Sequence, residues 1–194
     1  MVVSASVRPA GYSRRVSPHA AFPFDPIRRA ARLWERTWGA SSQSRAMAAA
    51  TSVMRVEQLL LARYDGLLAD LGLTFSRYEA LVLLSFSREG RLPMSKVGER
   101  LMVHPTSATH TVQRLEAQGF VRRMPNPDDG RGTLAAITPA GRAVLERATR
   151  LLVADGFGLS CLEDAEQAQL YQLLEKVRRT AGDFEDLNGP PASR

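Results

Sequence analysis

Apolar residues recur at helical spacing along most of the chain, and short polar or glycine-containing segments interrupt the pattern. The first periodic stretch opens at Asp25-Pro26, where Asp is a common helix cap and Pro fits the first turn. Trp34 and Trp38 then fall on one apolar face, because residues four apart are neighbours on a helix. The pattern predicts an N-terminal helical extension over residues 25–44.

A longer helix is predicted to follow, from about residue 45 to residue 70. Met47, Met54, Leu61 and Leu68 recur in it at seven-residue spacing, with further leucines beside them. A long apolar stripe of this kind is usually buried, either in the core of its own chain or against a partner helix.

The remaining pattern alternates capped helices with two strand-like runs. Ser76 with Glu79, and Ser160 with Glu163, match the capping box that starts a helix. Pro105 fits the first turn of another helix. The expected elements are helices over residues 76–87, 94–101, 105–119, 139–155 and 161–182, and strands over residues 120–124 and 133–137.

A short helix, a tight turn, a second helix and a two-stranded hairpin follow one another in the order of a winged helix-turn-helix. The fold class predicted is therefore mainly α with a small β-hairpin wing. Gly98 in the first of these helices leaves room for the second to cross closely. The second helix turns short polar groups away from its apolar side, as a helix that reads base edges in the major groove requires. These candidate DNA-binding residues are Thr106, Ser107, Thr109, His110, Gln113 and Arg114. An ordinary solvated face is the alternative, although Glu116 is its only acid.

The hairpin loop has the composition of a wing that contacts DNA. Gly130 and Gly132 permit a sharp tip, and Arg131 between them is placed to enter a minor groove. Asp129 is placed to orient the Arg131 guanidinium by an ion pair. The candidate phosphate contacts outside the tip are Lys96, Arg122 and Arg123.

Charge is distributed unevenly along the 194 residues. The net charge is +6, and residues 1–45 alone hold eight arginines against two acids. Residues 91–131 hold seven basic and four acidic side chains. Two positive segments indicate a polyanionic partner, with an ordinary solvated basic surface as the alternative. Residues 1–24 lack periodicity and acids and are predicted to be a disordered basic tail, with an organelle transit peptide or a start codon placed too far upstream as alternatives.

Several classes of protein are excluded by composition. Cys161 is the only cysteine, so there is neither an intrachain disulfide nor a cysteine-rich zinc module. The three histidines are not spaced as metal ligands are. No apolar run reaches the roughly 18 residues that are needed to span a bilayer. His104 and His110 belong to the predicted DNA-reading element and lack an acidic partner at a catalytic spacing. We therefore expect no metal, no cofactor, no membrane partner and no enzymatic activity.

Two motifs in register resemble those of the MarR family of bacterial transcriptional regulators. Asp129-Gly130-Arg131 followed by Ile137-Thr138 and Gly141 resembles the D-x-R…[LI]-T-x-x-G signature of that family. Leu115-Glu116…Gly119-Phe120-Val121 resembles the L-E-x-x-G-[LF]-V segment that leads from the recognition helix to the wing. The resemblance covers about residues 45–182.

The resemblance implies a cytoplasmic homodimer that represses transcription at an inverted-repeat operator. It assigns residues 45–73 and 139–182 to dimerisation, residues 74–138 to the DNA-binding lobe, and residues 183–194 to a flexible tail. The implied interface residues are Met54, Leu61, Leu68, Leu170, Leu173, Leu174 and Val177. It also implies release from DNA by a small phenolic or lipophilic effector, for which Tyr64, Phe75 and Tyr78 are candidate contacts unless they are plain core.

The sequence departs from the family pattern at three places. Met102 occupies a turn position where many relatives have glycine, and His110 stands where many have Arg or Asn. The arginine-rich extension before residue 45 lies outside the usual core. Two other functions remain open: a thiol-based redox sensor that uses Cys161 at the start of the last helix, and a winged helix that contacts only proteins.

Overall fold

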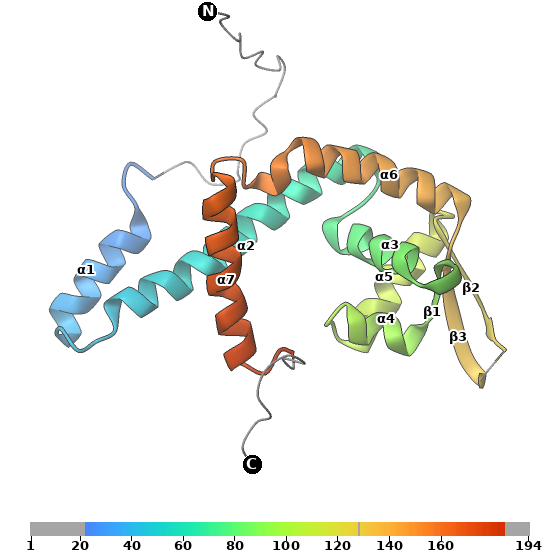
Figure 1. Cartoon of the computed structure of the whole chain (residues 1–194), viewed down its shortest axis with the longest axis horizontal. Coiled ribbons are helices and arrows are strands. Elements are labelled where there is room, and N and C mark those ends of the chain that lie inside the picture. The colour runs from blue at the N-terminus through green and yellow to red at the C-terminus, as the bar shows by residue number, and fades with distance from the viewer. Residues whose placement is uncertain (1–21, 128, 185–194) are drawn as a thin grey trace, which may run out of the picture. The chain divides into compact units, whose positions relative to one another are not determined.

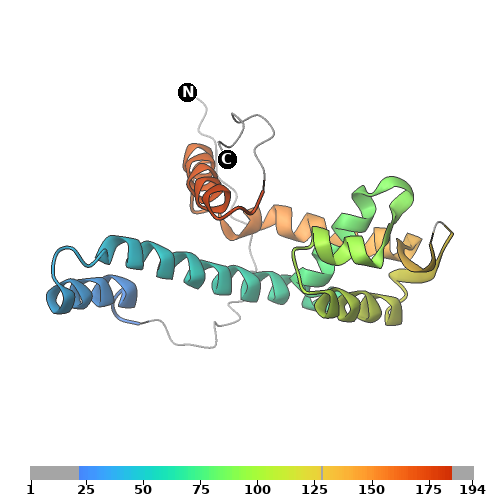
Figure 2. The ribbon, with the colours of Figure 1, turned by 90° about the horizontal axis from the view of Figure 1, so that it is seen from below.

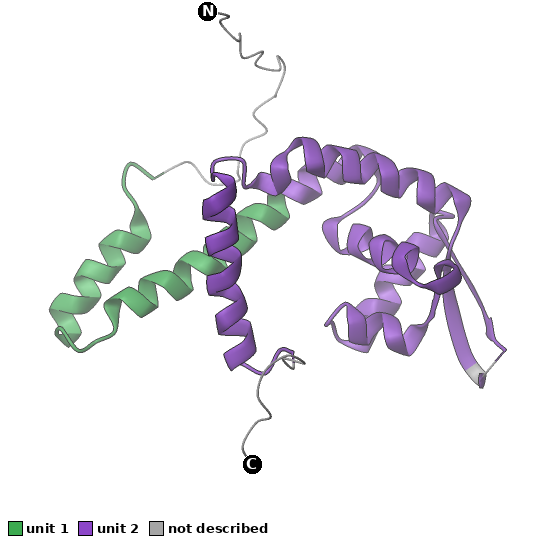
Figure 3. Ribbon diagram, in the orientation of Figure 1, with its two compact units in different colours: residues 1–62 green, residues 63–194 purple. Residues whose placement is uncertain are grey.

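The computed structural model describes residues 22–127 and 129–184 (Figures 1 and 2). The expected disordered tail over residues 1–24 and the flexible tail over residues 183–194 lie almost wholly outside the described residues. The chain divides into two compact units, residues 1–62 and residues 63–194 (Figure 3). Within the described residues, no helix combines the length and hydropathy needed to cross a membrane, and no cluster of His, Cys, Asp or Glu is arranged to hold a metal ion.

The first unit is a helical hairpin made by α1 (Pro26–Trp38) and the first part of α2 (Ser44–Leu68). Asp25 caps α1 as expected, because its carboxylate accepts hydrogen bonds from the backbone N–H groups of Ile27 (2.9 Å) and Arg28 (3.1 Å). The indole N–H of Trp34 donates to the carbonyl oxygen of Ser42 at 2.9 Å and fastens the connecting turn. None of the residues of α1 is buried.

The second unit has the element order of a winged helix-turn-helix. After the end of α2 its elements are a 3-10 turn η1 (Ala69–Leu71), α3 (Phe75–Phe86), a 3-10 turn η2 (Arg88–Gly90), β1 (Arg91–Pro93), α4 (Met94–Arg100), α5 (Pro105–Ala117), β2 (Val121–Asn126), β3 (Asp129–Ile137), α6 (Pro139–Ala154), a 3-10 turn η3 (Gly156–Gly158) and α7 (Asp164–Thr180). The mainly helical fold with a small wing is thus confirmed, and each predicted helix of the motif is present.

The wing is a three-stranded antiparallel sheet in the order β1-β3-β2. Val121 pairs with Ile137 at the base of the hairpin, and Leu92 of β1 pairs with Ala135 on the other side of β3. The sequence did not predict β1, because three residues that end in proline carry no alternation of their own. This strand exists only because β3 offers it a partner.

The core of the second unit lies under the sheet and between α3, α5 and α6. Its largest fully buried side chains include Leu81, Leu84, Val97, Leu115 and Leu152. Leu68 at the end of α2 is fully buried as well. The expectation that Leu68 belongs to an intersubunit stripe is therefore wrong, because the side chain is already covered by its own chain.

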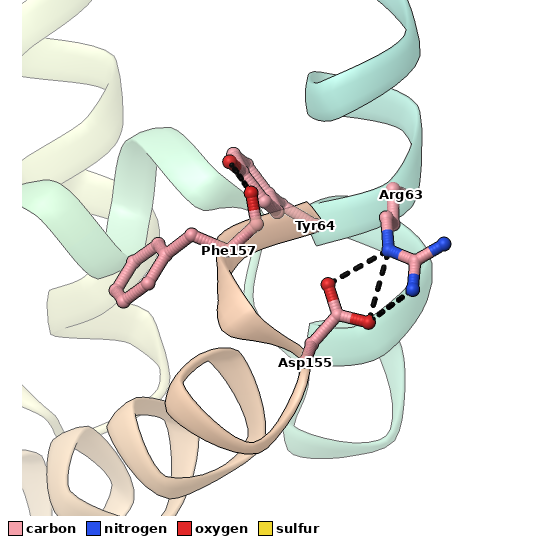
Figure 4. Close-up of polar contacts among 4 residues, drawn as sticks. All are labelled: Arg63, Tyr64, Asp155 and Phe157. Carbon is pink, nitrogen blue, oxygen red and sulfur yellow. Dashed lines mark hydrogen bonds and ion pairs between the residues drawn. The ribbon is translucent and has the colours of Figure 1, made fainter. Parts of the chain in front are cut away.

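The end of α2 is joined to the segment that follows α6 by two polar contacts (Figure 4). The Nε of Arg63 donates to both carboxylate oxygens of Asp155, at 2.9 and 2.7 Å. The hydroxyl of Tyr64 donates to the backbone carbonyl of Phe157 at 2.7 Å. The Asp155 carboxylate and the Tyr64 ring are both buried. The two contacts therefore fix the position of the C-terminal end of α2 relative to that of α6.

Two predicted helix starts were wrong. The N-cap of α7 is Glu163, which forms a capping box with Glu166, so Ser160 and Cys161 lie in the turn before the helix. The N-cap of α3 is Thr74, and the backbone N–H of Phe75 donates to the Asp65 carboxylate at 2.7 Å. In both places an acidic side chain satisfies the free N–H groups that a serine was expected to satisfy.

Candidate nucleic-acid interface

Helix α5 has an apolar face on the core and a polar face in solvent. Ala108, Val112 and Leu115 are buried on one side. On the other side, five of the six candidate residues are exposed: Thr106, Ser107, His110, Gln113 and Arg114. Thr109 differs, because it is half-buried and its hydroxyl donates to the carbonyl oxygen of Pro105 at 2.9 Å. The hydrogen-bonding groups of the exposed face, apart from the Thr109 hydroxyl, are therefore accessible to a ligand.

The start of α5 is fixed by a residue to which sequence reasoning gave no structural role. His104 is the N-cap, and its Nδ1 accepts the backbone N–H of Thr106 at 3.3 Å. Pro105 occupies the first helical turn, as predicted. Histidine is not among the common caps, so no local sequence signal identified it.

The turn between α4 and α5 contains a left-handed residue that is not glycine. Met102 has φ = 54°, and its side chain is 75% exposed. Val103 closes the turn by donating its N–H to the carbonyl oxygen of Gly98 at 3.2 Å. A Cβ on residue 98 would lie 3.5 Å from the Cβ of Ala108, which is ordinary van der Waals contact. The expected need for glycine at position 98 is therefore not a steric one.

The candidate wing residues lie on two adjacent strands, with Asn126 of β2 paired to Asp129 of β3 beside the tip. A Cβ on Gly132 would stand 2.8 Å from an oxygen of the Asp129 carboxylate, so a larger residue there would require the Asp129 side chain to move. The side chain of Arg131 lies outside the described part of the structure, and so does the ion pair expected between Asp129 and Arg131.

The two arginines at the base of the wing have different surroundings. Arg123 is bound to the end of α5: its Nε lies 2.6 Å from Oε2 of Glu116, and its backbone N–H donates to Oε1 of Glu116 at 3.2 Å. Arg122 is exposed and, among the described residues, has no ion-pair partner within 4 Å. Arg122 is thus available to a phosphate, whereas Arg123 already holds the wing to α5.

Lys96, the candidate contact on α4, is also paired. Its Nζ lies 2.7 Å from Oε2 of Glu99, and this hydrogen bond holds the pKa of the Glu99 carboxyl below its usual value. Both side chains are exposed, so solvent screens the pair and it contributes little to stability. The pair would therefore exchange readily for a phosphate contact.

The Thr-x-x-Gly part of the wing motif has a structural role. The hydroxyl of Thr138 donates to the carbonyl oxygen of Gly119 at 2.7 Å and accepts the N–H of Gly141 at 3.0 Å. Thr138 thereby caps α6 and ties it to the chain that leaves α5. These residues set the position of the wing relative to α5.

The three aromatic candidates for effector contacts pack against one another. The ring centroids of Tyr64 and Phe75 are 4.6 Å apart, and those of Phe75 and Tyr78 are 5.8 Å apart. The hydroxyl of Tyr78 lies 3.3 Å from that of Thr149, and both tyrosines are buried. Phe75 is half-buried, which makes it the most accessible of the three rings.

Comparison with known proteins gives one consistent family. Residues 74–133 match the profile of the MarR family. The chain is 32% identical over 120 residues to an organic hydroperoxide resistance transcriptional regulator of Bacillus subtilis, with 60% of this chain and 80% of the relative covered. It is 54% identical to Sco5413, a MarR family transcriptional regulator from Streptomyces coelicolor, with a TM-score of 0.68 and 73% and 98% of the two chains covered. Sco3205 from the same organism, solved in complex with DNA, is 29% identical with a TM-score of 0.63 over 68% of this chain and 84% of its own.

Proposed function

Because the chain belongs to the MarR family of transcriptional regulators, we propose that it is a homodimeric repressor of an inverted-repeat operator. The observation that carries this proposal is the exposed polar face of α5, which is held over a buried apolar face beside an exposed wing. The proposal places the protein on double-stranded DNA in the cytoplasm.

The groups on α5 suit the base edges of a major groove. Thr106, Ser107 and Gln113 have short or amide side chains that both donate and accept hydrogen bonds, and Arg114 pairs well with guanine or phosphate. Arg131 would enter the adjacent minor groove while Arg122 and Lys96 contact phosphates. Arg123 has a different role in this proposal: it positions the wing by holding Glu116.

Dimerisation is supported by apolar side chains that the single chain leaves in solvent. Helix α7 buries none of its own residues, yet Tyr171, Leu173 and Val177 on it are 60%, 58% and 67% exposed. Met54 and Leu61 on α2 are 64% and 41% exposed. Large apolar residues exposed on one helix are typical of a protein interface. We assign α2 and α7, without Leu68, to contacts with a second copy, so that two α5 helices read half-sites about 34 Å apart.

A small phenolic or lipophilic effector would act beside the aromatic cluster of Tyr64, Phe75 and Tyr78. Phe75 offers a ring face, and its helix α3 packs against both α5 and α6. A ligand that displaces α3 would therefore shift the recognition helix. This step predicts that an effector lowers DNA affinity and that Phe75→Ala changes the response to it.

The thiol-sensor alternative loses its physical basis. Cys161 is exposed in the turn before α7, three residues ahead of the first helical residue, Asp164. The helix dipole expected to activate the thiol acts within the first turn, and Glu163 occupies the cap.

The test is fluorescence anisotropy of the full chain on DNA from upstream of its own gene and on a scrambled duplex, over a salt series. We expect tight, sequence-preferring binding whose logarithm falls linearly with the logarithm of salt concentration. Gln113→Ala should reduce the preference for the upstream DNA, Arg131→Ala should reduce affinity for both duplexes, and Arg147→Gln on α6 serves as the control. Absence of binding at low salt by a folded dimer would refute DNA binding and would favour a winged helix that contacts only proteins.

A further inference from the structure

We propose that α1 is a second, sequence-independent binding surface for the phosphate backbone of duplex DNA. Its arginine face is made by Arg28, Arg29, Arg32 and Arg36, which lie three or four residues apart on one side of the helix. These four side chains, together with Phe24, Asp25 and Leu33, line a shallow groove on the surface of the first unit. The inference rests on the proposed function, because it assumes that the protein is brought to DNA.

The arginine face is strongly positive and only partly neutralised. Asp25 is the single acid in the groove, and its carboxylate lies 3.8 Å from Nε of Arg28 in an exposed pair. Among the described residues, neither Arg32 nor Arg36 has an ion-pair partner within 4 Å. Arg29 stacks on the ring of Phe24 at 4.9 Å, which holds its guanidinium over the groove. A concentrated and largely unpaired positive face of this kind is complementary to the phosphate backbone of DNA.

The spacing of the face also suits a DNA strand. Arg28, Arg32 and Arg36 form a row about 12 Å long, because an α-helix rises ~1.5 Å per residue. One strand of B-DNA presents a phosphate every ~3.4 Å along the axis, so three or four phosphates lie within the reach of that row. The contact would carry no sequence information, since guanidinium groups bind phosphates of every nucleotide alike.

The opposite face of α1 favours DNA over an anionic membrane. A basic amphipathic helix binds a membrane by burying its apolar face in the lipid boundary. In this chain Ile27 and Ala31 line a second groove together with Ala48 and Ser52 of α2, and the Trp34 indole is bonded to Ser42. Trp34 and Trp38 are exposed, but Ile27 and Ala31 are half-buried beside α2 and would have to leave it for the whole face to enter lipid. The exposed arginine face meets DNA without any rearrangement.

The test compares two double variants that remove the same charge. Arg32→Gln/Arg36→Gln removes two charges from α1, and Arg147→Gln/Arg150→Gln removes two exposed charges from α6. Arg32→Lys/Arg36→Lys keeps the charge on α1. Each full-length protein is titrated over a salt series with duplexes of about two and about six helical turns, and far-UV circular dichroism verifies that helix content is unchanged. Arg131→Ala is measured in parallel as the reporter of the wing.

We expect the α1 glutamine variant to lower the salt slope on the long duplex by about 0.9 for each lost phosphate contact, so by one to two per chain. Its affinity at low salt should fall about ten-fold or more, while the lysine variant and the α6 variant bind like the parent. The loss should be smaller on the short duplex, which extends less beyond the operator contacts. Preference for the upstream DNA over a scrambled duplex should not change.

Other outcomes would overturn the inference. If the α1 glutamine variant keeps the parental slope while Arg131→Ala loses affinity, the α1 surface does not bind DNA and the proposed function stands. If the parent protein does not bind DNA at all, both claims fail together. If vesicles of phosphatidylserine and phosphatidylcholine bind the parent but not the α1 glutamine variant, and the DNA slope is unchanged, the surface is a lipid-binding one instead.

Discussion

Gly141 lies so close to the carbonyl oxygen of Phe120 that a Cβ on residue 141 would stand 2.1 Å from it. The neighbour is backbone, and the same segment is held by the hydroxyl of Thr138, which also caps α6. The close approach lets the start of α6 pack against the chain between α5 and β2. The glycine of the wing motif therefore has a packing role, because only a residue without a side chain allows this approach.

Gly141→Ala should be strongly destabilising because backbone cannot yield as a flexible side chain does. We expect the free energy of unfolding to fall by about 3 kcal/mol or more, the upper range for overpacking. The measurement is urea denaturation followed by circular dichroism, at equal protein concentration for parent and variant because a dimer's stability depends on it.

Gly98→Ala is the matched comparison, since both glycines are buried and both lie in helices. A Cβ at position 98 would meet neighbouring atoms only at 3.5 Å and beyond. Alanine is favoured over glycine in a helix by about 1 kcal/mol, so this variant should match the parent or exceed it in stability. A large loss at position 98 would show that α4 and α5 pack more tightly than these distances indicate.

Met102→Gly should stabilise the protein by about 0.5–1 kcal/mol. Met102 adopts a positive φ, which costs a residue with a Cβ about 1 kcal/mol or more and costs glycine nothing. Little packing is lost, since the side chain is mostly exposed. Met102→Ala keeps the Cβ and should give no such gain in thermal unfolding. Equal stability of the two variants would mean that the methionine side chain, and not the backbone, determines the energy of this turn.

The elements that sequence patterns predicted well are those whose signals are local. Pro105 and Thr138-Pro139 mark the starts of α5 and α6 correctly, because a proline in the first turn and a hydroxyl cap act within a few residues. The apolar face of α5 follows equally from helical periodicity. These local signals were enough to predict the winged helix-turn-helix order.

The features that were missed depend on partners distant in the sequence. β1 requires pairing with β3, the N-terminus of α3 is satisfied by Asp65 of α2, and Leu68 is covered by the second unit's own core. The pair between Glu116 and Arg123 needs the end of α5 beside β2, and periodicity gives no information about that contact. The only sequence feature that pointed to this pair is the position of Glu116 in the motif that leads into the wing.

Arg122→Gln and Arg123→Gln should separate the two arginines of the wing base. We expect Arg122→Gln to lower the salt slope of DNA binding by about 0.9 per chain, as loss of one phosphate contact does. Arg123→Gln should change the slope less, because its guanidinium is already bound to Glu116. Salt-dependent anisotropy on one duplex measures both.

Glu116→Gln completes this comparison. The variant removes a carboxylate from the interface and releases the Arg123 guanidinium, so nonspecific DNA affinity should rise. A slope that falls as much for Arg123→Gln as for Arg122→Gln would show that the pair opens when DNA binds.

Tyr64→Phe should remove a contribution to stability that the parent protein loses in alkaline solution. Burial raises the pKa of the Tyr64 hydroxyl above its ordinary value of 10.0, the nearby Asp155 carboxylate adds to the rise, and the Arg63 guanidinium opposes it. The folded protein therefore holds this proton more tightly than the unfolded chain does. Its contribution is fully present below pH 10 and is lost as the pH rises through the raised pKa of the folded state.

Urea denaturation of parent and Tyr64→Phe at several pH values measures this contribution. At pH 7–9 the variant should be less stable by a constant amount of about 1 kcal/mol, since it lacks the hydrogen bond to the carbonyl of Phe157. Above pH 10 the parent should lose stability faster than the variant, so the two curves converge. Parallel curves throughout would mean that Tyr64 titrates alike in the folded and unfolded chains and that its hydroxyl is not held by the end of α6.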